Sequence, residues 1–357
     1  VVHCRGAVDV QVAVETAHRA GIPLSVRGGG HDWAGRALCD GLVIDLGDMR
    51  DVNVSPDRRS ALVGGGARIA DLLAATDRLG LAAATGSRSG VGMAGLTLGG
   101  GYGPLIGRFG LALDNLVAAD LVLADGSIAT ADALREKELF WALRGGGGNF
   151  GVVTAMRLRV HEPPNVTAGM LIFPFNEAKS VLQRCAEIMP SLPAEFTLEV
   201  GALAGPGGAP AILLLPTWCG APGRGEGLIA QILKFGTVLD SSVALRRYGD
   251  LIASFDRHIV HGQRVLMENC WTAELDEAVI DALVGAMANA VSPGCAILTH
   301  QFKGAAAAVA VGATAFGLRR NHLLVEILAS FPDRPEDSSE EERHRQWLQA
   351  ASQGFRA

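Results

Sequence analysis

The chain has 357 residues, of which 49% are hydrophobic and 19% are charged, and its formal net charge is −6. This composition provides enough apolar residues for a substantial core and argues against a disordered chain. Lysine and arginine are scattered, which argues against nucleic acid as the main partner, and no apolar run approaches the roughly 20 residues that span a bilayer. The length suits two domains, or one large domain with an insertion.

Residues 1–162 are predicted to mix helices and strands. Asp9 is a candidate cap for a helix that ends at Gly21. The other expected elements, in chain order, are strands at 22–26, 41–46 and 60–65, a helix at 67–80, a hairpin over 116–131, a helix at 133–145 and a strand at 151–160. Because these elements do not alternate as regular β-α-β units, the predicted fold class is α+β.

Glu162-Pro163-Pro164 is the first strong break and the predicted boundary of a second domain, residues 163–335. There the pattern indicates an antiparallel sheet with helices on one face. Its expected strands lie at 167–173, 196–204, 210–218, 294–302 and 322–331, and its expected helices at 176–189 and 275–291. The charged stretch 332–345 is predicted to be a surface loop before a last helix.

The six cysteines lie far apart and form no Cys-x-x-Cys pair, so neither a metal cluster nor a disulfide framework is predicted. The chain begins at Val1 without a signal-peptide pattern, and its first residues already read as the middle of a domain. Cellular compartment and oligomeric state are left open.

Four glycine runs stand in the first domain, at 28–30, 64–66, 99–101 and 145–148. None forms a Walker loop, and none follows the Gly-x-Gly-x-x-Gly pattern of a nicotinamide-binding domain. An isolated run of this kind more often forms a tight turn. Several runs in one domain favour a cradle of backbone N–H groups around the pyrophosphate of an elongated cofactor.

Three segments carry a family resemblance: "VRGGGHDWAG" (26–35), "TGSRSGVGMAGLTLGGGYGPLIGRFGLALDNL" (85–116) and "ELFWALRGGGGNFGVVT" (138–154). In this order and spacing they resemble the FAD-binding domain of the berberine-bridge-enzyme-like oxidases, within the vanillyl-alcohol-oxidase (PCMH-type) superfamily. The pattern is most similar to the hydroxynicotine-oxidase-like branch. The resemblance implies a PCMH-type FAD domain of two α/β subdomains, followed by the substrate domain. It also implies that residues 336–357 begin a C-terminal segment returning to the FAD domain, with a Tyr-x-Asn motif expected beyond Ala357.

The resemblance implies that His31 bonds covalently to the 8α-methyl group of FAD, in a loop that wraps the pyrophosphate. A neutral imidazole is a suitable nucleophile near pH 7, and the bond would raise the flavin's redox potential. Many relatives have a second, cysteinyl link, but Arg88 stands at that position and no cysteine occurs between residues 40 and 184. A single attachment is therefore expected. The residues implied to bind FAD are Arg27, Gly28, Gly29, Gly30, His31, Thr85, Gly86, Val91, Gly92, Gly95, Leu96, Thr97, Asp114, Asn115, Asn149, Gly151 and Val153.

Two residues are candidates for catalysis. Glu268 stands where relatives commonly carry a lysine, on a strand that should face the flavin, and burial would suit it as a general base. A salt-bridged or exposed edge position explains Glu268 equally well. Tyr102, in the glycine loop 99–103, is the second candidate. His258, His261, His300 and Arg264 are ambiguous, and Trp218 and Trp271 are expected in the core, with an apolar substrate platform as the alternative.

The expected function is an FAD-dependent oxidase of a small alcohol, sugar or amine. Hydride would pass to the flavin, and O2 would reoxidise it with release of H2O2. The alternatives are a dehydrogenase with another electron acceptor and a flavin-binding protein without turnover. The expected partners are a small-molecule substrate and O2, with neither nucleic acid nor membrane.

Overall fold

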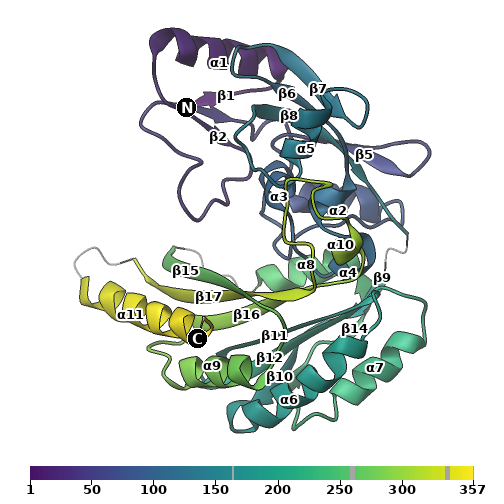
Figure 1. The fold of residues 1–357 in the computed structure, drawn as a ribbon, viewed down its shortest axis with the longest axis vertical. Coiled ribbons are helices and arrows are strands. Elements are labelled where there is room, and N and C mark those ends of the chain that lie inside the picture. The colour runs from purple at the N-terminus through teal and green to yellow at the C-terminus, as the bar shows by residue number, and fades with distance from the viewer. Residues whose placement is uncertain (163–164, 258–261, 334–337, 357) are drawn as a thin grey trace. The chain divides into compact units, whose positions relative to one another are not determined.

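The computed structural model describes residues 1–162, 165–257, 262–333 and 338–356. It divides the chain into two compact units (Figure 1). The first comprises Val1–Pro164, Arg247–Arg257 and Ala305–Arg319, and the second comprises Asn165–Arg246, His258–Gly304 and Arg320–Ala357. The domains predicted from the sequence are consecutive, with boundaries at 162 and 335. They do not include the two later segments in which the chain returns to the first unit. The returns occur because the segments bury Tyr248, Phe255 and Arg319 in the first unit.

In the described part of the first unit, two sheets are covered by helices. A parallel sheet has the order β1-β3-β2, and an antiparallel sheet has the order β4-β5-β8-β6-β7. The strands are β1 (Val2–His3), β2 (Leu24–Arg27), β3 (Leu42–Asp45), β4 (Val52–Val54), β5 (Ser60–Gly64), β6 (Leu116–Val122), β7 (Ile128–Asp132) and β8 (Val152–Arg159). The helices are α1 (Ala7–Ala20), α2 (Ile69–Asp77), α3 (Met93–Gly99), α4 (Ile106–Phe109), α5 (Lys137–Leu143), α8 (Tyr248–Asp256) and α10 (Ala305–Ala308).

Helix α1 shows how local sequence sets an element. It ends at Gly21, whose φ of 63° is the left-handed conformation that glycine adopts without strain. Its N-cap is Gly6, so the prediction that Asp9 caps it is wrong. Asp9 lies in the first turn, where its carboxylate accepts a 2.8 Å hydrogen bond from the backbone N–H of Arg5. Val10, Ala13, Val14 and Ala17 form the buried stripe.

The second unit contains a large sheet whose main path runs β13-β10-β12-β11-β16-β17-β15. The pairs along it from β10 to β15 are antiparallel. The strands are β9 (Asn165–Ala168), β10 (Leu171–Pro174), β11 (Phe196–Ala204), β12 (Pro210–Trp218), β13 (Asp240–Ser241), β14 (Ala244–Arg247), β15 (Gln263–Thr272), β16 (Cys295–Phe302) and β17 (His322–Pro332). The helices are α6 (Ala178–Ile188), α7 (Arg224–Ile232), α9 (Glu277–Ala288) and α11 (Ser338–Gly354).

Helices α6, α9 and α11 lie along one face of this sheet (Figure 1), and the main core of the unit fills the space between. Val200, Ile297 and Val325 are core residues, so the residues that alternate with them point to the opposite face. An antiparallel sheet covered by helices is thus confirmed, and with it the α+β class.

Helix α11 differs from the prediction in where it begins and in which unit it packs against. The predicted loop 332–345 is helical from Ser338, and pairs four residues apart, such as Glu341 with Arg345, support the helix. Its buried residues Trp347, Leu348 and Ala351 belong to the core of the second unit, where it packs on β15, β17 and α9.

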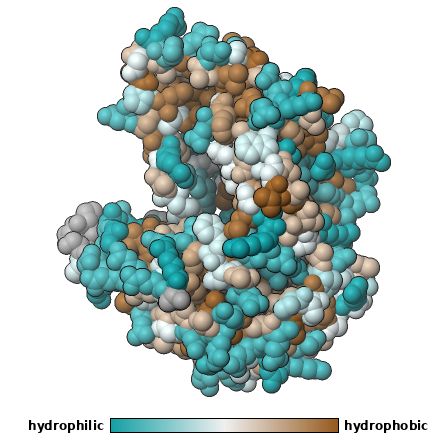
Figure 2. Space-filling view, in the orientation of Figure 1, coloured by the Kyte–Doolittle hydropathy of each residue, from teal (hydrophilic) through white to brown (hydrophobic). Residues whose placement is uncertain are grey.

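Hydrophilic residues cover much of the face drawn in Figure 2, with hydrophobic residues among them. No helix in the described ranges is long and apolar enough to cross a membrane. The described residues also hold no group of three histidine, cysteine or acidic side chains arranged for a metal ion.

Candidate functional site

The loop that follows β2 is anchored at its first residue. The guanidinium of Arg27 donates a 2.6 Å hydrogen bond to Oδ2 of Asp45 on the neighbouring strand β3. Burial opposes ionisation of Asp45, but hydrogen bonds from the Gly47 N–H and from Arg27 outweigh it and lower the pKa of this carboxyl. The ion pair therefore fixes the point at which Gly28–Gly30 leave the sheet.

Gly29 and Gly92 meet backbone to backbone. A Cβ built on Gly29 would lie 2.2 Å from N of Gly92, and a Cβ on Gly92 would lie 2.4 Å from N of Gly29, so neither position admits a side chain. Gly28 lies against the carbonyl of Gly65, 3.3 Å from a built Cβ. Loops far apart in the sequence thus converge through bare backbone.

His31 lies in the exposed segment just beyond this convergence. Its ring packs edge-on against Trp33, with ring centroids 5.4 Å apart. Within the described ranges, neither ring nitrogen of His31 has a hydrogen-bond partner. The imidazole therefore has both nitrogens available for a further bond.

The segment 85–99 has the features of a cofactor cradle. Buried hydroxyls of Ser87 and Thr97 have no hydrogen-bond partner among the described residues. Nothing lies within 4 Å of a Cβ built on Gly90, Gly95 or Gly99. Buried polar atoms need a partner, and open glycines allow a ligand to approach the backbone. FAD, with its hydroxyl, carbonyl and phosphate groups, fits both features.

Helix α8 contacts residues 85–89 of this segment, and the sequence did not predict this contact. The hydroxyl groups of Tyr248 and Thr85 lie 3.1 Å apart, and both side chains are fully buried. Arg88 donates a 2.7 Å hydrogen bond to the carbonyl of Phe255, and the backbone N–H of Ser89 donates to the carboxylate of Asp256. Tyr248 follows Thr85 by 163 residues in the sequence, so only the folded structure reveals that they are partners.

The remaining cofactor predictions in this segment concern Gly86, Val91 and Leu96. The Leu96 side chain lies 3.3 Å from a Cβ built on Gly86, so these two positions are neighbours. The carbonyl of Val91 accepts a hydrogen bond from the N–H of Ile69, which begins α2. These contacts hold the loop, and direct contact of the three residues with FAD stays a prediction.

Asp114 and Asn115 use their side chains within the protein. Asp114 accepts two hydrogen bonds from Arg319, of 2.8 and 3.0 Å, and this ion pair is almost fully buried. The amide of Asn115 donates to the carbonyls of Phe109 and Leu111, and its Oδ1 lies 2.7 Å from Nε2 of His161. These contacts give both residues a structural role, and their contact with FAD stays a prediction.

The third motif, at 145–154, again brings backbones together. Gly151 has a φ of 146°, and a Cβ there would lie 2.7 Å from the Val122 carbonyl. A Cβ on Gly65 would lie 2.2 Å from the Val153 carbonyl, which joins this motif to the second glycine run. Asn149 is exposed and donates to the carbonyl of Gly146.

The two predicted catalytic residues occupy different units. Tyr102 is half-buried in the first, with its ring 6.2 Å from that of Phe316. Glu268 belongs to the second and alternates with outward-facing residues of β15, so it points toward the helix-covered face. There Arg356, which follows the end of α11, donates to it at 3.3 Å. This ion pair corresponds to the structural alternative for Glu268.

Of the ambiguous residues, Arg264 forms ion pairs with Asp333 and Glu341, and His258 and His261 lie outside the described residues. Trp218 is buried as expected, but Trp271 is 58% exposed, so its predicted place in the core is wrong. It lies on an edge strand of the sheet, on the face opposite the helices.

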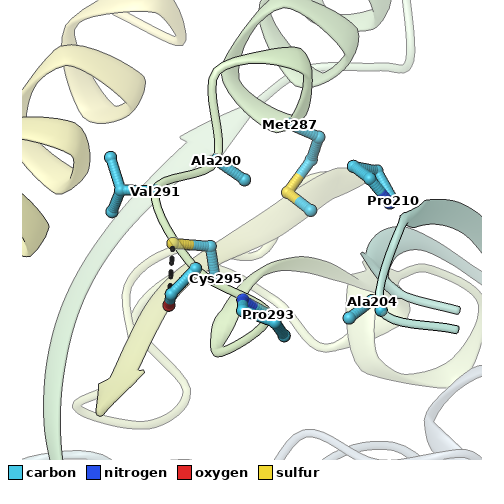
Figure 3. Close-up of a pocket in the computed structure, with 9 residues that line it drawn as sticks. Ala204, Pro210, Met287, Ala290, Val291, Pro293 and Cys295 are labelled. Carbon is cyan, nitrogen blue, oxygen red and sulfur yellow. Dashed lines mark hydrogen bonds between the residues drawn. The ribbon is translucent and has the colours of Figure 1, made fainter.

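A cavity of about 170 Å³ lies elsewhere in the second unit (Figure 3). Apolar side chains such as Met287, Pro210 and Val291 line much of it, together with Ser292, which contacts Cys295 at 3.9 Å and His344 at 2.8 Å. None of the predicted cofactor or catalytic residues lines it.

Comparison with known proteins agrees with this geometry. Residues 1–132 match the model of an FAD binding domain. The chain is 30% identical to the FAD-linked oxidoreductase aurO of Gibberella zeae over 91% of its own length and 65% of that protein's. It is 33% identical to (R)-6-hydroxynicotine oxidase of Paenarthrobacter nicotinovorans over 71% of its own length and 56% of that protein's. The chain thus spans less than two thirds of either relative.

Among solved structures, 6-hydroxy-D-nicotine oxidase from Arthrobacter nicotinovorans superposes with a TM-score of 0.86 at 28% identity, covering 99% of this chain and 79% of that one. Berberine bridge enzyme from Eschscholzia californica shares the fold, with a TM-score of 0.87 at 21% identity over 99% and 74% of the two chains. With the glycine cradle and the sheet described above, these matches show an FAD-binding domain and the fold of the berberine-bridge-enzyme-like FAD-linked oxidoreductases, and the chain is similar to the hydroxynicotine oxidases among them.

Proposed function

We propose that the protein is an FAD-dependent oxidase of small molecules, with its flavin attached through His31 alone. The observation that carries the proposal is the convergence of Gly28, Gly29, Gly65 and Gly92 beside an imidazole whose two nitrogens are unpaired within the described ranges. When bound, FAD would supply a hydride acceptor for a C–H bond next to oxygen or nitrogen, and O2 would reoxidise it to give H2O2.

The chain's own residues would hold the cofactor in two ways, and a third contact bears on the number of covalent bonds. The Arg27–Asp45 ion pair fixes the loop that presents His31. The hydroxyls of Ser87 and Thr97 gain the hydrogen-bond partners that they lack in the described structure. Arg88 donates to Phe255 at the position where relatives carry a second attachment site, which supports a single covalent bond.

The names of relatives suggest the substrates to try first. They include (R)-6-hydroxynicotine oxidase and a xylooligosaccharide oxidase of Thermothelomyces thermophilus. An amine and a sugar are therefore the two classes to compare. Tyr102 remains a candidate for contact with either, whereas the ion pair with Arg356 favours a structural role for Glu268.

The test of attachment is acid precipitation of the purified protein, followed by flavin absorbance and fluorescence of the pellet. We expect flavin in the wild-type pellet and none in the pellet of His31→Ala. His18→Ala is the matched control, because His18 is an exposed histidine of the same unit. Flavin that is released by the wild type would overturn the covalent link, and absence of flavin would overturn the whole proposal.

Turnover is tested with an oxygen electrode and a peroxide assay on (R)-6-hydroxynicotine and xylobiose. Consumption of O2 with equal formation of H2O2 would support an oxidase. Reduction of dichlorophenolindophenol without O2 consumption would show a dehydrogenase instead. Flavin that is never reduced under anaerobic conditions would favour a binding protein without turnover.

A further inference from the structure

The cavity of Figure 3 has room for a small organic group, and every residue that lines it belongs to the second unit. Met287 and Cys295, each 1% exposed, form its buried part, and exposed residues such as Gly208 and Pro293 form its rim. Its volume of about 170 Å³ is close to the roughly 150 Å³ of an apolar cavity that holds benzene. A phenyl ring or a short acyl chain therefore fits it.

Ser292, which lines this cavity, is hydrogen-bonded to a buried imidazole. Its Oγ lies 2.8 Å from Nε2 of His344 on α11, a residue that is 1% exposed. Nδ1 of the same ring lies 2.7 Å from the carbonyl oxygen of Glu340, one turn earlier in the helix. A carbonyl oxygen can only accept, so Nδ1 carries a hydrogen, and in the neutral ring Nε2 accepts the hydroxyl hydrogen of Ser292.

Packing holds the imidazole of His344 in this orientation. The ring stacks on that of Phe331 on β17, with the ring centroids 4.4 Å apart and 19° between the ring planes. The hydrogen bond to the Glu340 carbonyl fixes the tautomer, which is the task of the third group in a serine–histidine catalytic site. His344 is therefore oriented as a general base for the hydroxyl of Ser292.

Backbone N–H groups of the same loop suit the charges that form in acyl transfer. The N–H of Gly294 donates to Oγ of Ser292 at 3.2 Å, so it stabilises negative charge on this oxygen as the hydroxyl proton leaves. The N–H of Ser292 itself has no hydrogen-bond partner in the ranges that the structure describes. An N–H on the nucleophilic residue is a suitable donor to the carbonyl oxygen that becomes negative during attack.

Cys295 is the competing nucleophile in this cavity. Its Sγ lies 3.9 Å from Oγ of Ser292. The thiol belongs to a residue that is 1% exposed, whereas Ser292 is half-buried. The imidazole of His344 is bonded to the hydroxyl of Ser292, and a nucleophile needs such a base at hydrogen-bond distance. The geometry therefore favours the hydroxyl over the thiol.

We propose that Ser292 is a nucleophile for small esters, with His344 as its general base and the cavity as the site for the acyl group. Oγ attacks the carbonyl carbon of the ester, and its proton passes to Nε2 of His344. The bond from the carbonyl carbon to the alkoxy oxygen breaks, and the alcohol leaves with that proton. The acyl group is then bonded to Oγ of Ser292.

Water completes the reaction at the acyl carbon. His344 takes a proton from the attacking water and returns it to Oγ of Ser292 as the bond between Oγ and the acyl carbon breaks. Ester and water thus give a carboxylic acid and an alcohol, with no oxidation or reduction. This activity goes beyond the proposed oxidation and does not depend on it.

The first experiment needs no variant. The full chain with its flavin is treated with p-nitrophenyl butyrate, quenched in acid during turnover and digested, and the acylated peptide is identified by mass spectrometry. We expect steady release of p-nitrophenol and a butyryl group on Ser292. Absence of acylation, or acylation confined to surface lysines, would overturn the proposal and leave the oxidase intact.

Variants distinguish the hydroxyl from the thiol. Ser292→Ala should abolish ester hydrolysis, and His344→Gln should lower kcat about 100-fold or more, as expected for loss of a general base. Ser191→Ala is the control, because it removes an exposed hydroxyl that bonds to the carbonyl of Ile188, and it should leave hydrolysis unchanged. Hydrolysis that survives in Ser292→Ala but is lost in Cys295→Ala would assign the reaction to the thiol and overturn the proposal.

The cavity is tested with Ser292 and His344 both in place. Ala204 lines it (Figure 3), so Ala204→Phe should fill part of the acyl site and raise KM for p-nitrophenyl butyrate at least about tenfold, with kcat little changed. A merely structural hydrogen bond between Ser292 and His344 predicts no such split between KM and kcat. Equal KM values for this variant and the wild type would overturn the assignment of the cavity as the acyl site.

Discussion

The two units differ in whether the backbone or the side chains provide their distinctive contacts. In the first, bare backbones converge at Gly29 and Gly92, and the side chains of Asp114 and Asn115 are occupied by internal partners. In the second, neighbouring strands pair through their backbones, and charged side chains are displayed on one face. A backbone cradle suits a large cofactor with many acceptors, whereas a sheet holds charged side chains at fixed positions.

Two partly buried histidines differ in the same way between the units. His161, in the first unit, stacks on Phe109 and faces the amide of Asn115, so burial lowers its pKa to about 4, helped by Arg159 and Arg108. His300, in the second unit, is held as a cation by two carboxylates. The identity of the partner decides the charge of a buried imidazole, because burial acts on both rings in the same direction.

The largest expected effect on flavin binding comes from adding one methyl group to the first unit. Gly29→Ala would place Cβ 2.2 Å from N of Gly92, a contact between backbones that cannot shift cheaply. We expect loss of bound flavin and a loss of stability on the order of 3 kcal/mol. Flavin content and urea denaturation measure the two effects.

The control is Gly227→Ala in helix α7 of the second unit, where nothing lies within 4 Å of a built Cβ. It should stabilise the protein by about 0.5–1 kcal/mol. Equal behaviour of the two variants would show that the first unit does not depend on bare backbone.

The next effect concerns the buried ion pair of the first unit. Arg319→Met leaves Asp114 with an uncompensated buried charge, which should cost about 3–5 kcal/mol of unfolding free energy before any relaxation of the site. Lys179→Met removes an exposed partner of Asp281 in the second unit, and because solvent screens this pair it should change the free energy of unfolding far less. Urea midpoints of the two variants, read side by side, would contradict the comparison if they moved equally.

The smallest effect is the pH dependence of the two units. His161 has a folded pKa lowered from 6.5 to about 4, so the unfolded chain binds its proton first, and the first unit should lose on the order of 2 kcal/mol as pH falls from 6.5 to 4. For His300 the shift is upward, so its contribution is present below pH 6.5 and is lost as pH rises through the folded pKa.

Amide hydrogen exchange, resolved by unit, measures this difference. Protection should fall on the acid side in the first unit and on the alkaline side in the second. His161→Gln should flatten the first response and leave the second unchanged. Parallel pH responses of both units would be inconsistent with opposite charges on the two rings.

Local pattern predicted the parts of this structure that depend on neighbours in the sequence. Buried and exposed residues alternate along 322–331 because of strand pleating, and the glycine runs follow from backbone sterics. Both features could therefore be predicted from the sequence. The α8 contact to Thr85 and the Arg319–Asp114 pair join residues 163 and 205 positions apart, and no local signal marks them.

The candidate site shows the same limit. Glu268 and Glu326 are both acidic residues on largely apolar strands, and the sequence does not distinguish their surroundings. Strand register does, because it turns Glu268 toward α11 and Glu326 toward His300. Trp271 was expected in the core for the same reason: its apolar character was visible, but its place on an edge strand was not.

The two returns of the chain to the first unit have a consequence for synthesis. A ribosome that has made residues 1–164 has not yet supplied the Tyr248 hydroxyl for Thr85 or the guanidinium for Asp114. Domains that are continuous in sequence can fold in the order in which they emerge, but this unit must wait until residue 319 has left the exit tunnel. The nascent first unit therefore carries an unneutralised acid and an open loop while the second unit is being translated, and chaperones have that interval in which to bind it.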